Sequence, residues 1–325
     1  MTANGALDVR SWEQPIETGE MPESGAEFDA IVVGGGPGGS SAAGYLAKAG
    51  AKVLLIEKEV WPRDKICGDA VGGKSLSHVQ ELGVKADLES TPHFRVTGIM
   101  FSSPKGNSVR VPLPEEDVQR LEAGYALPRA QFDSLLFNRC QKLVRDAGGS
   151  VIQGGEVRTV LFDDGKGGED PGEGTGDARH ASGLVIRIGG RGGEERTFHS
   201  RELVGAGGYR CPVARSVVES SYGENMVDRD HYCGGYREYW RNVKGCEESS
   251  GDIEIHFVDT VIPGYFWLFP VSENVVNVGI GMVMGLMPLV GVPLPLVSYG
   301  GSSVVTNMVG FGILLNISMR KFTTT

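Results

Sequence analysis

The fold is decided by Phe28-Asp29-Ala30-Ile31-Val32-Val33-Gly34-Gly35-Gly36-Pro37-Gly38-Gly39-Ser40-Ser41-Ala42-Ala43. A short apolar run ends in glycines and small residues follow, which predicts a strand, a tight turn and a helix. Gly34, Gly36 and Gly39 fit the spacing G-x-G-x-x-G, in which the glycines permit the turn, a close approach to phosphate and tight helix packing. We expect a pyrophosphate at the helix N-terminus, where free N–H groups favour anions.

The residues after this helix extend the same motif. Gly50 suits the helix end, and the apolar run Lys52–Ile56 predicts a second strand that stops at Glu57. Glu57 lies 18 positions after Gly39 (57 − 39), where an acid accepts hydrogen bonds from a ribose. The alternative is a simple glycine turn followed by a surface glutamate, but strand, turn, helix, strand and acid all agree with a dinucleotide site.

Composition narrows the class of protein. The 325 residues carry a formal net charge of −10, which argues against nucleic-acid binding. None of the five cysteines forms a C-x-x-C, so we predict neither a disulfide framework nor a metal site, and a cytoplasmic location. Residues 1–27 are acidic and lack the apolar core of a signal peptide, and we expect them to be disordered.

The middle of the chain predicts a mixture of helices and strands. A helix is expected over 74–82, and another begins near Arg129 and closes at Gly148-Gly149. Residues 163–180 are rich in Gly, Asp and Glu and predict the loop at the tip of a hairpin. Strands are expected within 94–113, 151–152, 157–162, 184–188, 201–208 and 231–281.

The final segment is of a different kind. Residues 274–319, between Glu273 and Arg320, hold no charged residue over 46 positions (319 − 274 + 1). A helix of about 20 apolar residues spans a bilayer, so the segment predicts an apolar helical tail over 282–325, with membrane association through 282–319. A buried core helix followed by a proline-rich loop is the alternative.

Residues 28–281 resemble the geranylgeranyl reductase family of flavoproteins, within the p-hydroxybenzoate-hydroxylase-like group. Four pieces carry the resemblance: the glycine turn with Glu57, the loop Lys65-Ile66-Cys67-Gly68-Asp69, the segment Arg129-Ala130-Gln131-Phe132-Asp133, and Pro263-Gly264-Tyr265-Phe266-Trp267-Leu268-Phe269-Pro270. The resemblance implies an α/β fold, in which a Rossmann-like FAD/NAD(P)-binding domain precedes a β-sheet substrate domain that is truncated here. We assign 28–95 and 125–220 to the first domain, and 96–124 and 221–281 to the second.

The resemblance also implies roles for individual residues. The pyrophosphate would lie against Gly34, Gly36, Pro37, Gly38, Gly39 and Ser40. Glu57 would hold the ribose, Arg129 would meet the phosphate or ribitol side, and Val157 would offer backbone groups to adenine. Cys67 and Gly68 would lie near the flavin ring, and Lys58 and Lys65 complete the expected cofactor set. The alternatives are a solvated arginine at the helix start for Arg129 and a buried structural thiol for Cys67.

The implied activity is reduction of C=C bonds in isoprenoid chains by hydride from reduced flavin, with NAD(P)H or another electron donor. Tyr265, Trp267 and Phe269 would line an apolar tunnel for the isoprenoid, although sheet packing is an equal alternative for Phe269. The proton could come from Cys67, Tyr265 or a bound water. A flavin monooxygenase or halogenase is the alternative function on the same fold.

Two departures from the family pattern bear on activity. First, Ala206-Gly207-Gly208 replaces the Asp-Gly pair of related flavoproteins. Second, a later Gly-Asp segment that closes over the flavin in the family is missing. We therefore expect weak FAD binding and impaired activity. Residues 285–303 instead resemble the C-terminal signature of the RodA/FtsW family, membrane polymerases of lipid II active in cell shape and division. The chain therefore resembles a fusion near 281–285, and a membrane fragment of that second family is a further alternative.

Overall fold

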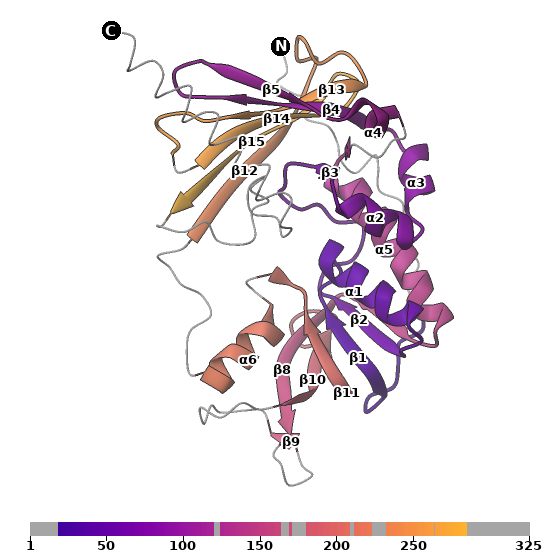
Figure 1. Ribbon diagram of the computed structural model, residues 1–325. Helices are drawn as coiled ribbons and strands as arrows, with labels where there is room; N and C mark the ends of the chain where they lie inside the picture. Colours follow the sequence, from indigo (N-terminus) through magenta and orange to yellow (C-terminus); the bar gives the residue numbers. More distant parts are fainter. Residues whose placement is uncertain are drawn as a thin grey trace.

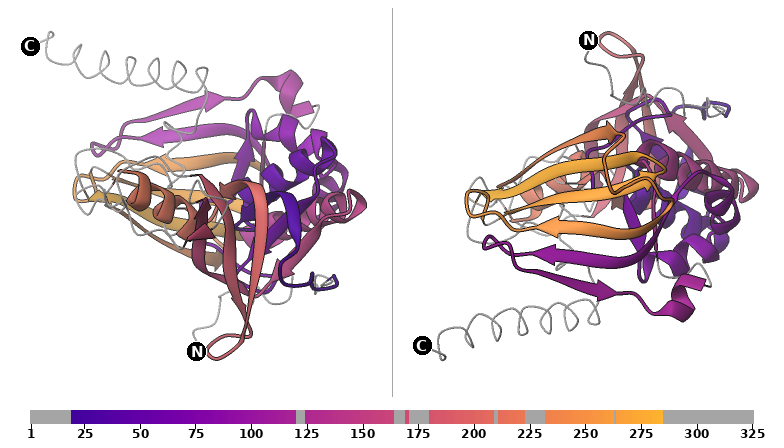
Figure 2. Two further views of the ribbon diagram at one scale, coloured as in Figure 1. Left: turned by 90° about the horizontal axis from the view of Figure 1, so that it is seen from below. Right: turned by 90° about the horizontal axis from the view of Figure 1, so that it is seen from above.

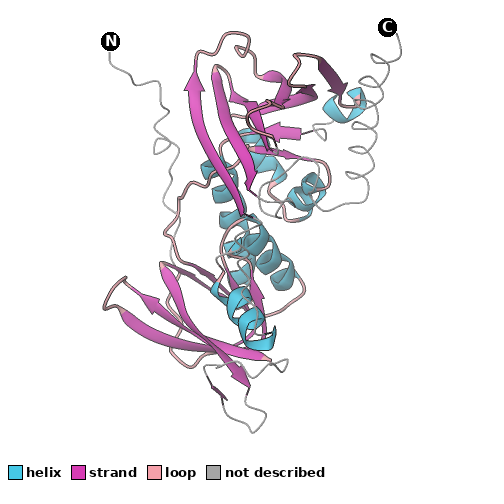
Figure 3. Cartoon of the chain, turned by 90° about the vertical axis from the view of Figure 1, so that its left-hand side faces the viewer, coloured by secondary structure: helices cyan, strands magenta, loops and turns pink. Residues whose placement is uncertain are grey.

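The computed structural model describes residues 19–119, 124–163, 169–170, 180–208, 211–222, 232–262 and 264–284. Within these residues the chain forms two β-sheets, with helices packed between and beside them (Figure 1). Turning the molecule about the vertical axis shows the same order of layers, sheet, helices and sheet (Figure 3).

The first sheet is built around the strand that carries the glycine turn. Its strand order is β7-β2-β1-β11-β10-β8-β9, and β1 is parallel to both β2 and β11. Strands β1 and β2 are buried apolar runs, as expected for parallel strands that are covered on both faces. The strands are β1 (Glu27–Val33), β2 (Val53–Glu57), β7 (Ser150–Gln153), β8 (Gly155–Asp163), β9 (Glu169–Asp170), β10 (Ala181–Ile188) and β11 (Glu194–Gly205).

Helices cover both faces of this sheet. Helices α1 (Pro37–Lys48) and α5 (Arg129–Asp146) pack on the face formed by Val32, Val53 and Leu55. Helix α6 (Pro212–Tyr222) packs on the opposite face. A Cβ added to Gly44 of α1 would lie 2.9 Å from the Cys140 sulfur of α5, so a small residue is needed where the two helices meet.

The second sheet has the order β12-β15-β14-β13-β4-β6-β3, and β5 pairs with β4. Figure 2 shows its strands side by side, although β4 and β13 are far apart in the sequence. The strands are β3 (Ala70–Gly72), β4 (Phe94–Ser102), β5 (Ser108–Pro112), β6 (Gly124–Ala126), β12 (Tyr232–Arg241), β13 (Ser250–His256), β14 (Gly264–Ser272) and β15 (Val275–Met284). Three short helices flank the sheet: α2 (Ser75–Glu81), α3 (Lys85–Ser90) and α4 (Glu115–Gln119).

Most expected elements are confirmed, including the strand–turn–helix–strand at the start, the helices at 74–82 and 129–146 and the strands within 94–113. The domain boundaries stay a prediction. Strands β3 and β6, which were not predicted because each has only three residues, belong to the second sheet. The expectation of disorder over 1–27 is wrong for 22–26. There the Gly25 N–H donates to Thr197 O at 2.7 Å, and Arg196 donates to Pro22 O at 2.7 Å.

Strands β8 and β10, on either side of the predicted loop over 163–180, pair antiparallel as a hairpin does, and β9 pairs with β8. Residues 164–168 and 171–179 of that loop lie outside the described residues. The apolar helical tail was predicted over 282–325. For residues 282–284 this is wrong, because they end strand β15, and residues 285–325 lie outside the described residues. Among those that are described, no helix has the length and hydropathy needed to cross a membrane.

Candidate functional site

The glycine turn between β1 and α1 is shaped by its backbone contacts. Gly34 has φ +110°, and a Cβ there would lie 2.8 Å from the Ala206 carbonyl carbon. A Cβ on Gly39 would lie 1.7 Å from the Gly34 carbonyl oxygen, so α1 approaches the turn as the motif requires. A Cβ on Gly38 would meet nothing within 4 Å. The N-cap of α1, Gly36, makes no side-chain capping hydrogen bond, so the first-turn amides are available to an anion.

Glu57 lies beside this turn, at the carboxyl end of β2. Its side chain is buried and accepts the Gly35 N–H at 2.7 Å and the Glu59 N–H at 3.0 Å. The acid is where the motif predicts it, and in this structure its two oxygens accept hydrogen bonds from the backbone. Glu57 therefore also stabilises the turn on which a ribose and diphosphate would rest.

Three residues of the expected set have other positions. The fully buried Ser40 donates its hydroxyl to Gly35 O at 2.7 Å and its N–H to Gly36 O at 2.8 Å, so it stabilises the turn from within. The Lys58 side chain is 71% exposed and pairs with Glu59 instead of reaching the turn. Val157 lies near the start of β8, opposite Ile186, and packs against the core of the first sheet.

A cluster of cations lies over the glycine turn. Arg129 forms a bidentate pair with Asp133 at 2.6 and 2.8 Å. Arg63 lies 3.7 Å from Glu57 and 3.6 Å from Asp133, and its guanidinium is 3.1 Å from the position of a Cβ on Gly36. Burial and the charges of Arg129 and Arg63 lower the pKa of Lys65. Three cations thus face two carboxylates, and the excess positive charge favours a diphosphate.

The expected substrate residues form one face of the second sheet. Tyr265, Trp267 and Phe269 are buried, with successive ring centroids 5.8 and 6.5 Å apart. This face is turned toward the cofactor loop, because a Cβ on Gly68 would lie 2.7 Å from the Phe269 ring. The Trp267 indole N–H donates to Asn277 Oδ1 at 2.9 Å. The loop over 65–69 therefore meets this aromatic face, which also packs as sheet core.

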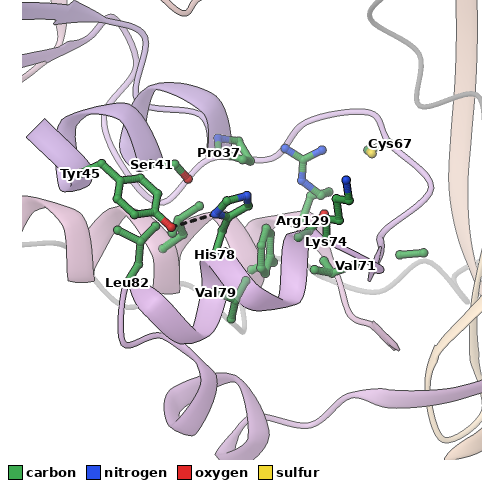
Figure 4. A pocket seen from close by; sticks show the side chains of 14 residues that line it. Pro37, Ser41, Tyr45, Cys67, Val71, Lys74, His78, Val79, Leu82 and Arg129 are labelled. Atoms are coloured by element: carbon green, nitrogen blue, oxygen red, sulfur yellow. Dashed lines mark hydrogen bonds between the residues drawn. The ribbon is translucent and has the colours of Figure 1, made fainter. Parts of the chain in front are cut away.

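A cavity of about 510 Å³ lies beside Cys67 of this loop and runs along α1. Pro37, Cys67 and Arg129, all predicted cofactor residues, line it together (Figure 4). At its other end the Tyr45 hydroxyl lies 2.8 Å from His78 Nδ1. The apolar part of the wall comes from Val71, Val79, Leu82, Phe132 and Leu136.

Some residues of the site were not predicted. Asp133 ends the quoted segment over 129–133, and the Arg-x-x-x-Asp spacing of α5 was a visible signal for the buried pair. Arg63 lies two residues before the quoted loop over 65–69. Asp69 ends the quoted loop and is 1% exposed. The side-chain partners of Asp69, Arg129 and Tyr239, lie 60 and 170 residues away, where no local pattern points to them.

Comparisons with known proteins show what this chain is similar to. Residues 27–168 match the family described as "FAD binding domain". The chain is 28% identical over 274 residues to the menaquinone reductase of Mycobacterium tuberculosis, an alignment that spans 83% of this chain and 59% of that relative. It is 30% identical over 266 residues to the digeranylgeranylglycerophospholipid reductase of Sulfolobus acidocaldarius, spanning 80% and 51%.

Solved structures share this fold. The chain resembles the myxobacterial halogenase CndH, with a TM-score of 0.60, 25% identity and coverage of 81% of this chain and 53% of that one. It also resembles a geranylgeranyl bacteriochlorophyll reductase-like protein of Thermoplasma acidophilum, with a TM-score of 0.56, 23% identity and coverage of 79% and 57%. The chain thus spans between half and three fifths of the length of these relatives.

A second family matches the end of the chain. Residues 262–322 match the family of FtsW, RodA and SpoVE, described as "Cell cycle protein". The match confirms the predicted join of two family segments. It overlaps β14 and β15, which pair with β13 and β12 in the second sheet, and its remainder lies outside the described residues.

Proposed function

We propose that this flavoprotein binds FAD with the diphosphate at the start of α1 and reduces C=C bonds of an isoprenoid lipid. The observation that carries the proposal is the G-x-G-x-x-G turn with Arg63 above it, 3.1 Å from the Cβ position of Gly36 and paired with Glu57 and Asp133. FAD supplies hydride when it is reduced. The names of the relatives, menaquinone reductase and digeranylgeranylglycerophospholipid reductase, support a prenylated substrate.

The protein's own contribution is binding and orientation. The amides of α1 and the Arg63–Arg129 pair of guanidiniums hold the phosphates, and Glu57 holds the ribose. Cys67 and Gly68 lie between the glycine turn and the aromatic face, so Tyr265, Trp267 and Phe269 place an apolar chain against the ring site and exclude water. NAD(P)H or another carrier supplies the electrons.

The test is an anaerobic single-turnover assay. Purified protein loaded with FAD is reduced with dithionite and mixed with a geranylgeranylated glycerophospholipid or with menaquinone. We expect a mass gain of about 2 Da for each reduced double bond, without oxygen uptake when air is later admitted with substrate. Substrate-dependent oxygen uptake, or halide incorporation, would instead support the monooxygenase or halogenase alternative that the CndH likeness raises.

We further propose that residues 282–319 associate with membranes. The uncharged run over 274–319 and the match to FtsW and RodA support this. Membranes from cells that express the chain are washed with alkaline carbonate, and retention in the pellet is expected. Release of the protein into the wash would contradict insertion and would also weaken the alternative of a lipid II polymerase fragment.

A further inference from the structure

Asp69 is a buried carboxylic acid to which none of the cofactor roles above is assigned. It is 1% exposed and has φ +63°, a backbone conformation uncommon outside glycine. Its Oδ1 accepts the Arg129 N–H at 3.2 Å and its Oδ2 accepts the Tyr239 hydroxyl at 2.5 Å. Its backbone carbonyl accepts the Leu127 N–H at 3.1 Å. A residue held in such a conformation by three partners is strongly determined by its surroundings.

The two groups that donate to the Asp69 carboxylate come from different parts of the fold. Arg129 begins α5, which covers the first sheet, whereas Tyr239 lies on β12 of the second sheet, 170 residues after Asp69. The carboxyl group of Asp69 therefore connects the cofactor-binding helix to the aromatic face.

The same side of the second sheet fixes the rest of the loop over 64–69. Arg237, two residues before Tyr239, donates to both Asp64 oxygens at 2.6 and 2.7 Å and to Lys65 O at 3.0 Å. Asn277 of β15 donates its amide to Cys67 O at 2.8 Å. These contacts place the Cys67–Gly68 peptide between the glycine turn and the sheet.

The surroundings of Asp69 disfavour the ionised form of its carboxyl group. Burial raises the pKa of Asp69 from 3.8 to about 7, while the Tyr239 hydrogen bond and the charges of Arg237 and Arg129 act in the opposite direction. The titratable and charged groups around it come from β12, α5 and its own loop: Tyr239, Arg237, Arg129, Asp133, Asp64, Lys65 and Cys67.

We propose that Asp69 is a positioning residue of the flavin site, which fixes the Cys67–Gly68 segment by bonding α5 on one side and Tyr239 on the other. The proposal rests on the proposed function, because Cys67, Gly68 and Arg129 are assigned there to FAD. In this proposal Asp69 does not contact FAD itself. It determines the positions of Cys67, Gly68 and Arg129, which do.

The first experiment needs no cofactor. Urea unfolding of the full chain is measured between pH 4 and 9 for the parent, Asp69→Asn, Tyr239→Phe and the control Asp87→Asn, an exposed acid on α3. The native parent binds the Asp69 proton more tightly than the unfolded chain does. Its unfolding equilibrium constant should therefore rise by up to about tenfold per pH unit from pH 4 to 7 and then level off.

The variants separate this role from general packing. Asp69→Asn should lose that pH dependence, and Asp87→Asn should keep it. Tyr239→Phe should extend it to higher pH, because the Tyr239 bond lowers the pKa of Asp69. The same pH dependence in the parent, Asp69→Asn and Asp87→Asn would overturn the proposal.

The second experiment uses FAD. Asp69→Ala should weaken FAD binding by at least about tenfold, since it removes the carboxylate that accepts the Arg129 amide and the Tyr239 hydroxyl. In the parent the flavin absorbance band should shift with pH near 7, and in Asp69→Asn it should not. Unchanged FAD affinity in Asp69→Ala, with a shift that persists in Asp69→Asn, would overturn the positioning role while FAD binding stands. A parent that takes up no FAD would overturn the proposed function, and the unfolding series would still decide on Asp69.

Discussion

Arg129 and Asp133 form a bidentate pair across one turn of α5, at 2.6 and 2.8 Å, with both side chains buried. A second guanidinium, that of Arg63, lies 3.6 Å from the same carboxylate. The orientation of two cations above the glycine turn is thus fixed by one acid before any ligand is bound. An arginine held in this way loses little side-chain entropy when it meets a phosphate.

Removing this acid should destabilise the fold strongly. We expect Asp133→Ala to lower the free energy of unfolding by about 3–5 kcal/mol, because it leaves a buried guanidinium without its partner. Asp146→Ala on the same helix is the matched control. Its partner Lys142 is exposed, and the loss should stay below about 0.5 kcal/mol. Urea unfolding measures both, and equal small losses would show that Arg129 is not held by Asp133.

Gly38 offers a test of the phosphate position that spares the fold. A Cβ at Gly38 meets no atom within 4 Å, so Gly38→Ala should fold as stably as the parent. It should nevertheless bind FAD at least about tenfold more weakly, or about 1.4 kcal/mol, because the added methyl group would lie beside the first-turn amides proposed to hold the diphosphate. Gly234→Ala, at an equally open position on β12, is the control. Flavin fluorescence quenching gives both affinities, and equal values would contradict the assignment.

FAD binding should be coupled to protonation of Lys65. Burial and the neighbouring Arg129 and Arg63 lower the pKa of this amine below its ordinary 10.5, and a bound diphosphate would raise it again. At alkaline pH, between the two values, binding should take up protons, and FAD affinity should fall as pH rises. Calorimetry in buffers of different ionisation enthalpy measures the proton uptake. Lys65→Met should abolish it, and uptake that persists in this variant would place its source elsewhere.

Gly279 should be intolerant of any side chain. A Cβ there would lie 2.1 Å from Trp267 Cζ2 and 2.7 Å from the Tyr236 carbonyl oxygen. We expect Gly279→Ala to displace Trp267, break its bond to Asn277 and lower the free energy of unfolding by about 1–3 kcal/mol. Gly235→Ala on β12, where the nearest atom is 3.7 Å away, is the control. Tryptophan fluorescence during unfolding reports on both, and an unperturbed Gly279→Ala would contradict the packing of the aromatic face.

Local sequence signals predicted the parts of the site that are contiguous in the chain. The spacing of Gly34, Gly36 and Gly39 predicts positions where a side chain would not fit. The structure confirms this at Gly34 and Gly39, where a Cβ would clash with backbone atoms. The apolar runs of β1 and β2, and the helical spacing of apolar residues in α5, likewise predicted these elements from the sequence. These features depend on neighbours within a few residues.

The contacts that complete the site join residues far apart, and the sequence did not predict them. The Tyr239 hydroxyl meets Asp69 across 170 positions, and Asn277 meets Cys67 across 210. Neither pair has a spacing rule, because its geometry is set by the order of strands in the second sheet. Ser40 shows a related difficulty: the motif places it at the turn, but only the coordinates show that its hydroxyl bonds Gly35 and not a ligand.

The long separation between Asp69 and the strand that bonds it has a consequence for biosynthesis. A ribosome releases the first βαβ unit well before it has translated β12 and β15, so the nascent loop has no partner for its acid during most of elongation. Contacts of such high sequence separation also form slowly. We therefore expect cofactor loading to be a late, post-translational event in the maturation of this flavoprotein.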